Sequence, residues 1–185
     1  MLLELLIFLK YPTYRTDENR DFKYRAGVFF QLLGLSLAVS FILGWLIGGI
    51  QVIFDLDFGK HAVDNFFERY SLLLVLLGAV MVAPVLEELI FRAPLSLFKQ
   101  KRTFPLIFYA FTLTFGFYHI TNFEMRQTTI LLAPVLVAPQ LVVGTILGYI
   151  RIRFGLVWAI ALHACYNLIL VVPVLLYKTL DIPLE

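Results

Sequence analysis

Five stretches of this sequence contain no charged side chain and are long enough to dominate its folding. They cover residues 26–54, 71–86, 103–123, 127–150 and 154–177 of the 185-residue chain. About 20 consecutive apolar residues span the hydrocarbon core of a bilayer as an α-helix. A helix also satisfies its backbone hydrogen bonds internally, as lipid requires. The pattern therefore predicts an all-α protein, a polytopic membrane helical bundle with about five transmembrane helices.

The composition supports the same interpretation and limits the partners. Hydrophobic residues make up 61% of the chain, charged residues make up 15%, and the mean hydropathy is +0.87. These values are typical of an integral membrane protein, whose first partner is the lipid bilayer. No linker rich in Pro, Gly or Ser divides the chain, so residues 1–185 are predicted to form a single membrane domain. The sequence contains no phosphate loop and no aromatic and basic surface for nucleic acid.

The basic residues predict how the chain is oriented in the membrane. Ten of them lie in the N-terminal tail and in the second and fourth connections: Lys10, Arg15, Arg20, Lys23, Arg25, Lys99, Lys101, Arg102, Arg151 and Arg153. Cytoplasmic loops carry such an excess. The N-terminus is therefore expected in the cytoplasm and the C-terminus on the opposite side, in the plasma membrane of a bacterium or archaeon.

Two shorter segments are expected to lie on the membrane surface. Residues 1–9 are apolar except for Glu4, lack a basic leader and a cleavage site, and are too short to span a bilayer. We expect them to form a short N-terminal interfacial helix and not a signal peptide. In the longest connection, 55–69, the apolar positions 58, 63, 66 and 67 predict a short amphipathic helix on the outer surface.

Proline and glycine mark positions where the spans should bend or approach one another. Prolines fall in or near the spans at Pro84, Pro94, Pro134, Pro139 and Pro173. Each removes a backbone hydrogen bond and favours a kink. Two pairs, Gly44-x-x-x-Gly48 and Gly144-x-x-x-Gly148, predict close contacts between helices, within the bundle rather than at a dimer seam.

Adjacent acidic residues in the second apolar region are the main functional signal. Glu87 and Glu88 stand in a helix that is otherwise apolar, with Arg92 one turn after Glu88. An acidic residue at the middle of a membrane helix costs roughly 2.5 to 3.5 kcal/mol unless partners, water or an ion receive it. Glu88 and Arg92 share a helix face and are expected to form an ion pair. Glu87 points about 100° away and is free to contact other groups.

Polar residues on two further predicted spans complete a candidate site. His119 lies on the third span, and His163 and Asn167 lie one turn apart on the last. At 1.5 Å per residue, Glu87, His119 and His163 lie ~16, ~22 and ~14 Å from the inner surface. Polar groups on three helices need one another in lipid. We therefore predict that they share a polar cavity.

This set of side chains suits peptide hydrolysis, which needs an activated water, a proton carrier and oxyanion donors. Glu87 can act as the general base, His119 can orient the water or move protons, and His163 with Asn167 can hold the oxyanion. Glu88 and Arg92 would support them. Cys165 is predicted to be a packing residue, because it points to the other side of the helix from His163.

Zinc is an open alternative. Glu87, His119 and His163 are ligand types that zinc accepts with a fourth position left for water. No His-Glu-x-x-His sequence is present, however, and Asn167 is a poor zinc ligand. The residues favour a reaction that requires no cofactor, with zinc possible.

The chain resembles the CAAX-processing and bacteriocin-processing (CPBP, or Abi) intramembrane proteases. The resemblance rests on Glu87-Glu88-x-x-x-Arg92, Phe115-x-x-x-His119 and His163-x-x-x-Asn167 in this order, and covers a catalytic core of about residues 71–172. It implies an all-helical endopeptidase with a cavity open to the cytoplasm. Glu87 and His119 would activate water and His163 and Asn167 would form the oxyanion hole. Glu88 and Arg92 would complete the first motif.

The resemblance also bounds the substrate and the alternatives. Family members are widely called metalloproteases, although a glutamate-dependent mechanism has been proposed, and their substrates range from prenylated CAAX proteins to leader peptides and membrane proteins. We expect a membrane-associated protein or peptide substrate. Because the chain is short for the family, a homodimer is a possible way to enclose the site. The alternative functions are a non-proteolytic membrane binding or immunity protein and a proton-coupled transporter, for which the sequence offers no internal repeat.

Overall fold

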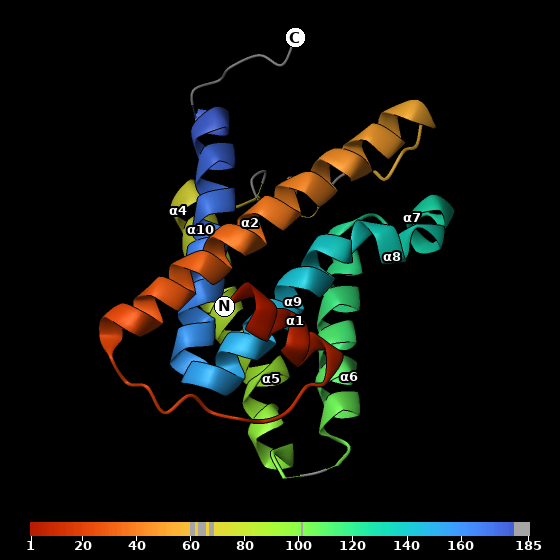
Figure 1. Ribbon diagram of the computed structural model, residues 1–185. Helices are drawn as coiled ribbons and strands as arrows, with labels where there is room; N and C mark the ends of the chain where they lie inside the picture. Colours follow the sequence, from red (N-terminus) through yellow and green to blue (C-terminus); the bar gives the residue numbers. More distant parts are fainter. Residues whose placement is uncertain (60–61, 63–65, 67–68, 101, 180–185) are drawn as a thin grey trace.

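The computed structural model describes residues 1–59, 62, 66, 69–100 and 102–179, and every regular element among them is a helix. The elements are α1 Leu2–Lys10, α2 Phe22–Ile53, α4 Leu72–Leu77, η1 Gly78–Val82, α5 Ala83–Phe91, η2 Ala93–Phe98, α6 Phe104–Tyr118, η3 His119–Asn122, α7 Gln127–Leu131, α8 Ala133–Leu136, α9 Ala138–Phe154 and α10 Leu156–Thr179 (Figure 1). The element η1 is a π-helical turn, and η2 and η3 are 3₁₀ helices. The predicted all-α class is confirmed.

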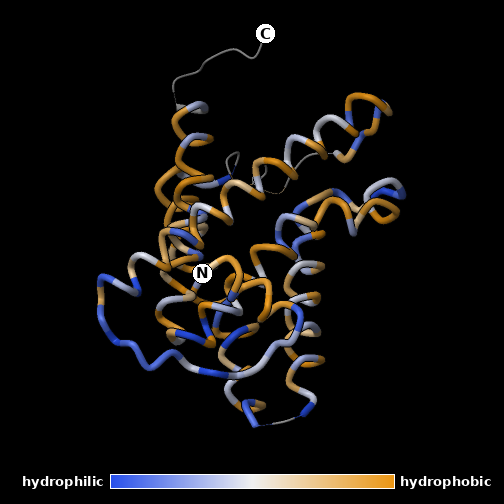
Figure 2. Tube along the Cα trace, viewed as in Figure 1, coloured by the Kyte–Doolittle hydropathy of each residue, from blue (hydrophilic) through white to orange (hydrophobic). Residues whose placement is uncertain are grey.

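Four helical segments among the described residues are long and apolar enough to cross a membrane. They are Phe22–Ile53, Leu72–Phe98, Phe104–Asn122 and Leu156–Tyr177. Figure 2 shows how apolar residues dominate these helices. They correspond to four of the five predicted spans, and the second extends beyond the uncharged stretch 71–86 as far as Phe98.

The fifth predicted span, 127–150, is divided into α7, α8 and α9. Pro134 and Pro139 occupy the first turns of α8 and α9. Proline has no N–H to continue a preceding helix but fits the start of a new one, so each proline ends one helix and begins another. The last piece, α9, has 17 residues and carries two arginines in its last turn. It therefore differs from a plain lipid-facing span.

Helix α9 is the centre of the bundle. It packs against α2, α6 and α10 (Figure 1). Leu147 and Ile150 of α9 are fully buried, together with Leu32 of α2 and Ala159 of α10. Cys165 packs on the edge of the same cluster, as predicted for a packing residue. The surrounding helices position the polar residues described below around α9.

The two glycine pairs behave differently. An added Cβ at Gly148 would lie 2.5 Å from Cε2 of Phe108, and one at Gly144 would lie 3.0 Å from Cδ1 of Phe115. Glycine therefore lets α9 approach α6, and this predicted contact within the bundle is confirmed. Gly44 and Gly48 have no described atom within 4 Å of such a Cβ. The close contact predicted for them is wrong within the monomer, because this half of α2 extends away from the other helices (Figure 1).

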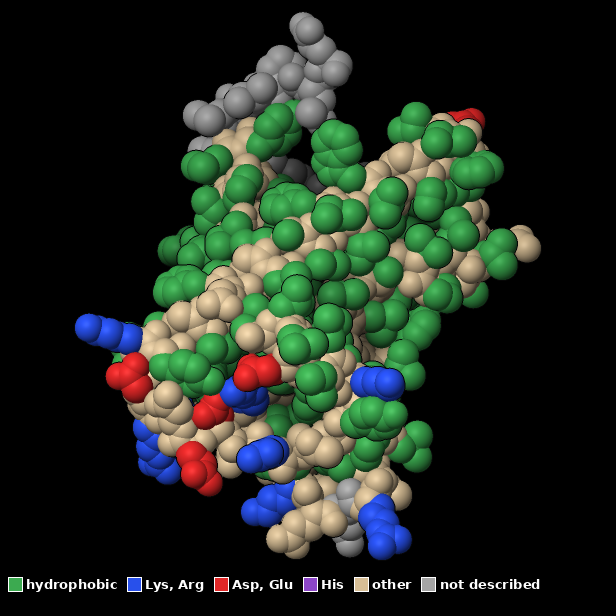
Figure 3. All heavy atoms as spheres, viewed as in Figure 1, with side chains coloured by type: hydrophobic (Ala, Val, Ile, Leu, Met, Phe, Trp, Pro, Cys, Tyr) green, Lys and Arg blue, Asp and Glu red, His purple; other side chains and the backbone are tan. Residues whose placement is uncertain are grey.

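Basic side chains gather at one end of the molecule (Figure 3). The N-terminal segment, the connection from η2 to α6 and the junction of α9 with α10 all lie there (Figure 1). This arrangement agrees with the predicted grouping of the three basic segments, and the side of the membrane that they face stays a prediction. The predicted amphipathic helix in 55–69 involves residues 60–61, 63–65 and 67–68, which lie outside the described residues.

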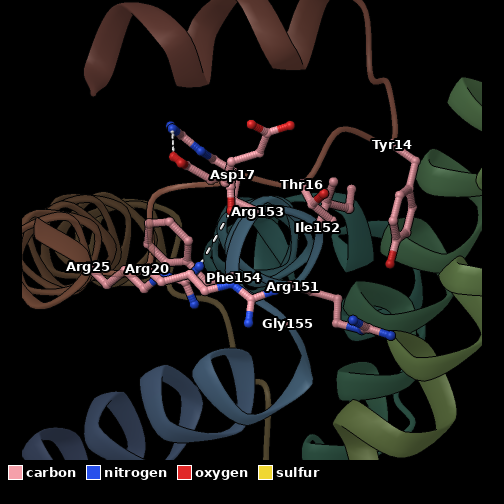
Figure 4. Close-up of a pocket in the computed structure, with 11 residues that line it drawn as sticks. Tyr14, Thr16, Asp17, Arg20, Arg25, Arg151, Ile152, Arg153, Phe154 and Gly155 are labelled. Atoms are coloured by element: carbon pink, nitrogen blue, oxygen red, sulfur yellow. Dashed lines mark hydrogen bonds and ion pairs between the residues drawn. The ribbon is translucent and has the colours of Figure 1, made fainter. Parts of the chain in front are cut away.

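Arg153, near the end of α9, ties the N-terminal segment to the bundle (Figure 4). Its Nη1 donates to Glu4 Oε2 of α1 at 2.7 Å, and its Nη2 pairs with Asp17 and donates to Tyr24 Oη at 3.0 Å. The hydrogen bond from Arg153, opposed by partial burial, lowers the pKa of Glu4 below its ordinary value of 4.5. One guanidinium thus joins α1, the N-terminal tail and α2 to α9.

Replacing Arg153 by Gln should lower the melting temperature of the purified protein in detergent, because three elements lose a charged hydrogen-bond partner. The expected decrease in the free energy of unfolding is roughly 1–3 kcal/mol. Arg20→Gln, in the exposed part of the same tail, is the control and should change little. Because the pKa of Glu4 is lowered in the fold, the difference between wild type and Arg153→Gln should be full above pH 4.5 and shrink as the pH falls below it. Equal melting temperatures for the Arg153 and Arg20 variants would contradict this role.

Candidate active site

Three helices carry the predicted catalytic residues to one place. Glu87 and Glu88 lie in α5, His119 stands where α6 passes into η3, and His163 lies in the middle of α10. Helix α5 packs against both α6 and α10. The Oε2 atom of Glu87 lies 3.9 Å from His119 Nε2 and 3.7 Å from His163 Nε2. The acidic and imidazole groups therefore meet, as the spacing of the sequence predicts.

Glu88 and Arg92 form the buried side of the site. Their side chains are 0% and 2% exposed, and Arg92 Nη1 lies 3.5 Å from Glu88 Oε1. The same oxygen accepts a 3.1 Å hydrogen bond from Nδ1 of His163. One carboxylate oxygen thus faces a guanidinium and an imidazole, two groups that stabilise a negative charge.

Two groups that the sequence did not identify as partners of Arg92 hold it in place. Its Nη2 donates to the carbonyl oxygen of Gly144 at 3.4 Å, and its Cζ lies 3.7 Å from the centre of the Phe115 ring. The first contact fixes α5 to α9, and the second is a cation–π interaction. Gly144 belongs to a predicted glycine pair and Phe115 to the segment that carries His119. Their contact with Arg92 depends on how α9 packs, which the sequence does not reveal.

The partner of each Nδ1 atom determines the tautomer of its imidazole, and so whether the Nε2 atom that faces Glu87 carries a hydrogen. Nδ1 of His119 lies 2.8 Å from the carbonyl oxygen of Phe115. A carbonyl only accepts, so this nitrogen carries the hydrogen, and in a neutral ring Nε2 keeps its lone pair. Nδ1 of His163 donates to Glu88 in the same way. Both Nε2 atoms are therefore proton acceptors that face the same carboxylate.

Three buried atoms of the site have no hydrogen-bond partner among the described residues: Glu87 Oε2, Glu88 Oε2 and Arg92 Nη1. Glu87 Oε2 is the one of them that faces both imidazoles. The Glu87 side chain as a whole is 18% exposed. The separations of 3.7 and 3.9 Å exceed a direct hydrogen bond. A slightly wider separation would admit one water molecule that contacts the carboxylate and an imidazole together. The carboxylate could then hold and deprotonate this water.

Asn167 is the predicted site residue that the structure places elsewhere. Its Nδ2 donates a 2.8 Å hydrogen bond to the carbonyl oxygen of Ala79 in η1. The predicted pairing of its amide with His163 as two donors is not present in this arrangement, because His163 donates to Glu88. Five of the six predicted residues therefore form one cluster: Glu87, Glu88, Arg92, His119 and His163.

The three groups proposed as zinc ligands have suitable chemistry and a spacing that is slightly wide. Zinc bonds to N and O ligands of 2.0–2.1 Å place tetrahedral ligand atoms about 3.4 Å apart. The two distances from Glu87 Oε2 are 3.7 and 3.9 Å. No group of three or more His, Cys, Asp or Glu side chains in the described part of the chain is arranged to hold a metal ion. Small side-chain movements would close the difference, so Glu87, His119 and His163 fit the donor set of zinc.

Comparison with known proteins identifies a family for this region. The family model described as type II CAAX prenyl endopeptidase Rce1-like matches residues 69–169. The match covers more than half of the 185 residues and includes every residue of the cluster and Asn167. No curated protein and no solved structure matches the chain.

Replacing Gly144 by Ala should disturb the buried side of the site, where Arg92 and Phe115 pack against α9. The added Cβ would lie 3.0 Å from Phe115 Cδ1 and 3.3 Å from Arg92 Nη2, so both side chains must shift. Overpacking of this kind costs roughly 1–3 kcal/mol, which thermal unfolding in detergent measures. Gly34→Ala is the matched control, because no described atom lies within 4 Å of its added Cβ. A Gly144→Ala protein as stable as Gly34→Ala would show that the contact is not tight.

Proposed function

Because the chain belongs to the Rce1-like family of type II CAAX prenyl endopeptidases, we propose that it is an intramembrane endopeptidase that hydrolyses a peptide bond with a water activated by Glu87. The observation that carries this proposal is Oε2 of Glu87, which is buried, lacks a hydrogen bond and lies within 4 Å of two imidazole nitrogens. The substrate is a membrane-associated protein or peptide.

Glu87 and His119 act on the water. The carboxylate of Glu87 accepts one proton as the water oxygen attacks the carbonyl carbon of the substrate. His119 Nε2, an acceptor in the neutral ring, orients the same water, and its ring is held by the hydrogen bond from Nδ1 to Phe115. When the C–N bond breaks, the proton passes from Glu87 to the leaving amine. The products are a carboxylic acid and an amine, so the atoms balance.

His163 and Glu88 act on the charge that develops. A second proton, taken from solvent onto His163 Nε2 before the attack and kept there through the reaction, makes this atom a donor for the oxyanion. The resulting imidazolium is stabilised by Glu88, which already accepts from Nδ1 at 3.1 Å. Arg92 Nη1 lies 3.5 Å from the same Glu88 oxygen and stabilises its negative charge. Glu88 and Arg92 therefore support catalysis without touching the substrate.

Glu87→Gln tests the role of the base. An amide cannot take a proton from water, so kcat should fall at least about 100-fold, with an unchanged melting temperature. The assay follows cleavage of peptides with a C-terminal Cys-a-a-X sequence, farnesylated and unmodified, and of a leader-peptide reporter, in proteoliposomes and by mass spectrometry. Glu18→Gln, an exposed acid in the N-terminal tail, is the control. Undiminished cleavage by Glu87→Gln would refute the mechanism.

We further propose that the reaction requires no metal. The support is that the residues already supply a base, a group that orients water and a positive charge for the oxyanion. When bound, zinc would polarise the carbonyl or the water from Glu87, His119 and His163. Activity that survives dialysis against 1,10-phenanthroline, with no zinc detected by elemental analysis, is the expected result. Loss of activity that Zn²⁺ restores, together with loss of bound zinc in His119→Ala, would contradict it.

Several finer statements remain predictions of the sequence. They are the choice between a CAAX-type and a leader-peptide-type substrate, the cytoplasmic N-terminus, the bacterial or archaeal plasma membrane and the homodimer. The three reporters above separate the two substrate types, because only the farnesylated peptide carries a lipid group and only the leader-peptide reporter carries a leader sequence.

A further inference from the structure

The helix that carries Glu87 is preceded by a turn with an unusual hydrogen-bond pattern. In η1 the N–H of Ala83 bonds to the carbonyl oxygen of Gly78, five residues earlier. In a regular α-helix this N–H would bond to Ala79. The next residue, Pro84, has no N–H to donate. The carbonyl of Ala79 therefore has no backbone donor from Ala83 or Pro84 while the turn is π-helical, whereas in the α register Ala83 would donate to it.

Asn167 supplies the missing donor from another helix. Its Nδ2 lies 2.8 Å from the Ala79 oxygen, and α10 packs along η1. One turn earlier on α10, His163 bonds to Glu88 at 3.1 Å. Helix α10 thus holds the helical segment at two points, one before Glu87 and one directly after it.

The π turn decides how α4 and α5 are rotated relative to each other. It inserts one extra residue, which turns the following helix by about 100° relative to the preceding one. Glu87 and Glu88 differ by the same angle. If α4 keeps its orientation, a change of register in η1 would therefore rotate α5 and alter which of the two carboxylates faces the imidazoles.

We propose that Asn167 is a positioning residue for Glu87: its amide donates to the Ala79 carbonyl that Pro84 leaves without a backbone donor, and so fixes the register of the π turn. The proposal rests on the function assigned to Glu87 above. It differs from an oxyanion role for Asn167, in which the amide acts on the substrate and the identity of residue 84 is irrelevant.

A double-mutant cycle with Asn167→Ala and Pro84→Ala separates these roles. Alanine at position 84 restores an N–H, and Ala79 then has a backbone donor in either register. Asn167→Ala should lower the melting temperature in detergent by several degrees and lower kcat at least tenfold in the wild-type background. In the Pro84→Ala background it should change both by little, with less than a twofold effect on kcat.

Tyr166→Phe is the matched control for this cycle. It removes a side-chain hydrogen bond of 2.8 Å from Tyr166 to Ser40, made by the residue next to Asn167 and independent of η1. Its effect on stability should be the same with Pro or Ala at position 84. The cleavage probe is a farnesylated Cys-a-a-X peptide, and the melting temperature is measured on the same preparations.

Each result bears on a different claim. An equal loss of kcat on Asn167→Ala in both backgrounds would overturn the positioning role and favour direct contact with substrate. Melting temperatures without coupling between residues 84 and 167 would also overturn it. If the wild-type protein cleaves no probe, the proposed function fails, and the melting temperatures still decide whether Asn167 supports the π turn.

Discussion

The buried carboxylate of Glu88, held between Arg92 and His163, is the interaction on which the site depends. All three side chains are at most 4% exposed. Glu88 contacts α10 through His163, and Arg92 contacts α9 through the Gly144 carbonyl. Three helices are thereby joined at one cluster of charges. Removing one member leaves an uncompensated buried charge, which typically costs about 3–5 kcal/mol.

Fixing Glu88 also fixes what its neighbour can do. Consecutive residues of a helix point about 100° apart, so Glu87 cannot share the ion pair. It turns instead to the edge of the site, where Glu87 is 18% and His119 16% exposed. One glutamate therefore maintains the structure and the other is available for chemistry. This division of roles explains why two adjacent acids occur in an apolar helix.

The sequence predicts the parts of this arrangement that depend on local spacing. The i,i+4 relation of Glu88 and Arg92 gives their ion pair, and the cost of polar groups in lipid predicts that Glu87 meets two imidazoles. The partner of Asn167 could not be predicted, because it depends on a π turn that forms before Pro84. To predict that the fifth span is divided, one would have to know that Pro134 and Pro139 begin separate helices. Which glycine pair makes a close contact depends on the packing of α9 against α6, and no local pattern encodes that.

The central claim is that Glu87 delivers a water directly to the peptide carbonyl. A single turnover of excess enzyme with a farnesylated Cys-a-a-X peptide in H₂¹⁸O, followed by mass spectrometry of product and enzyme, tests it most directly. Direct attack by water places one ¹⁸O in the new carboxylate of the product and none in Glu87. Label in the Glu87 side chain would reveal a covalent acyl intermediate and contradict the account.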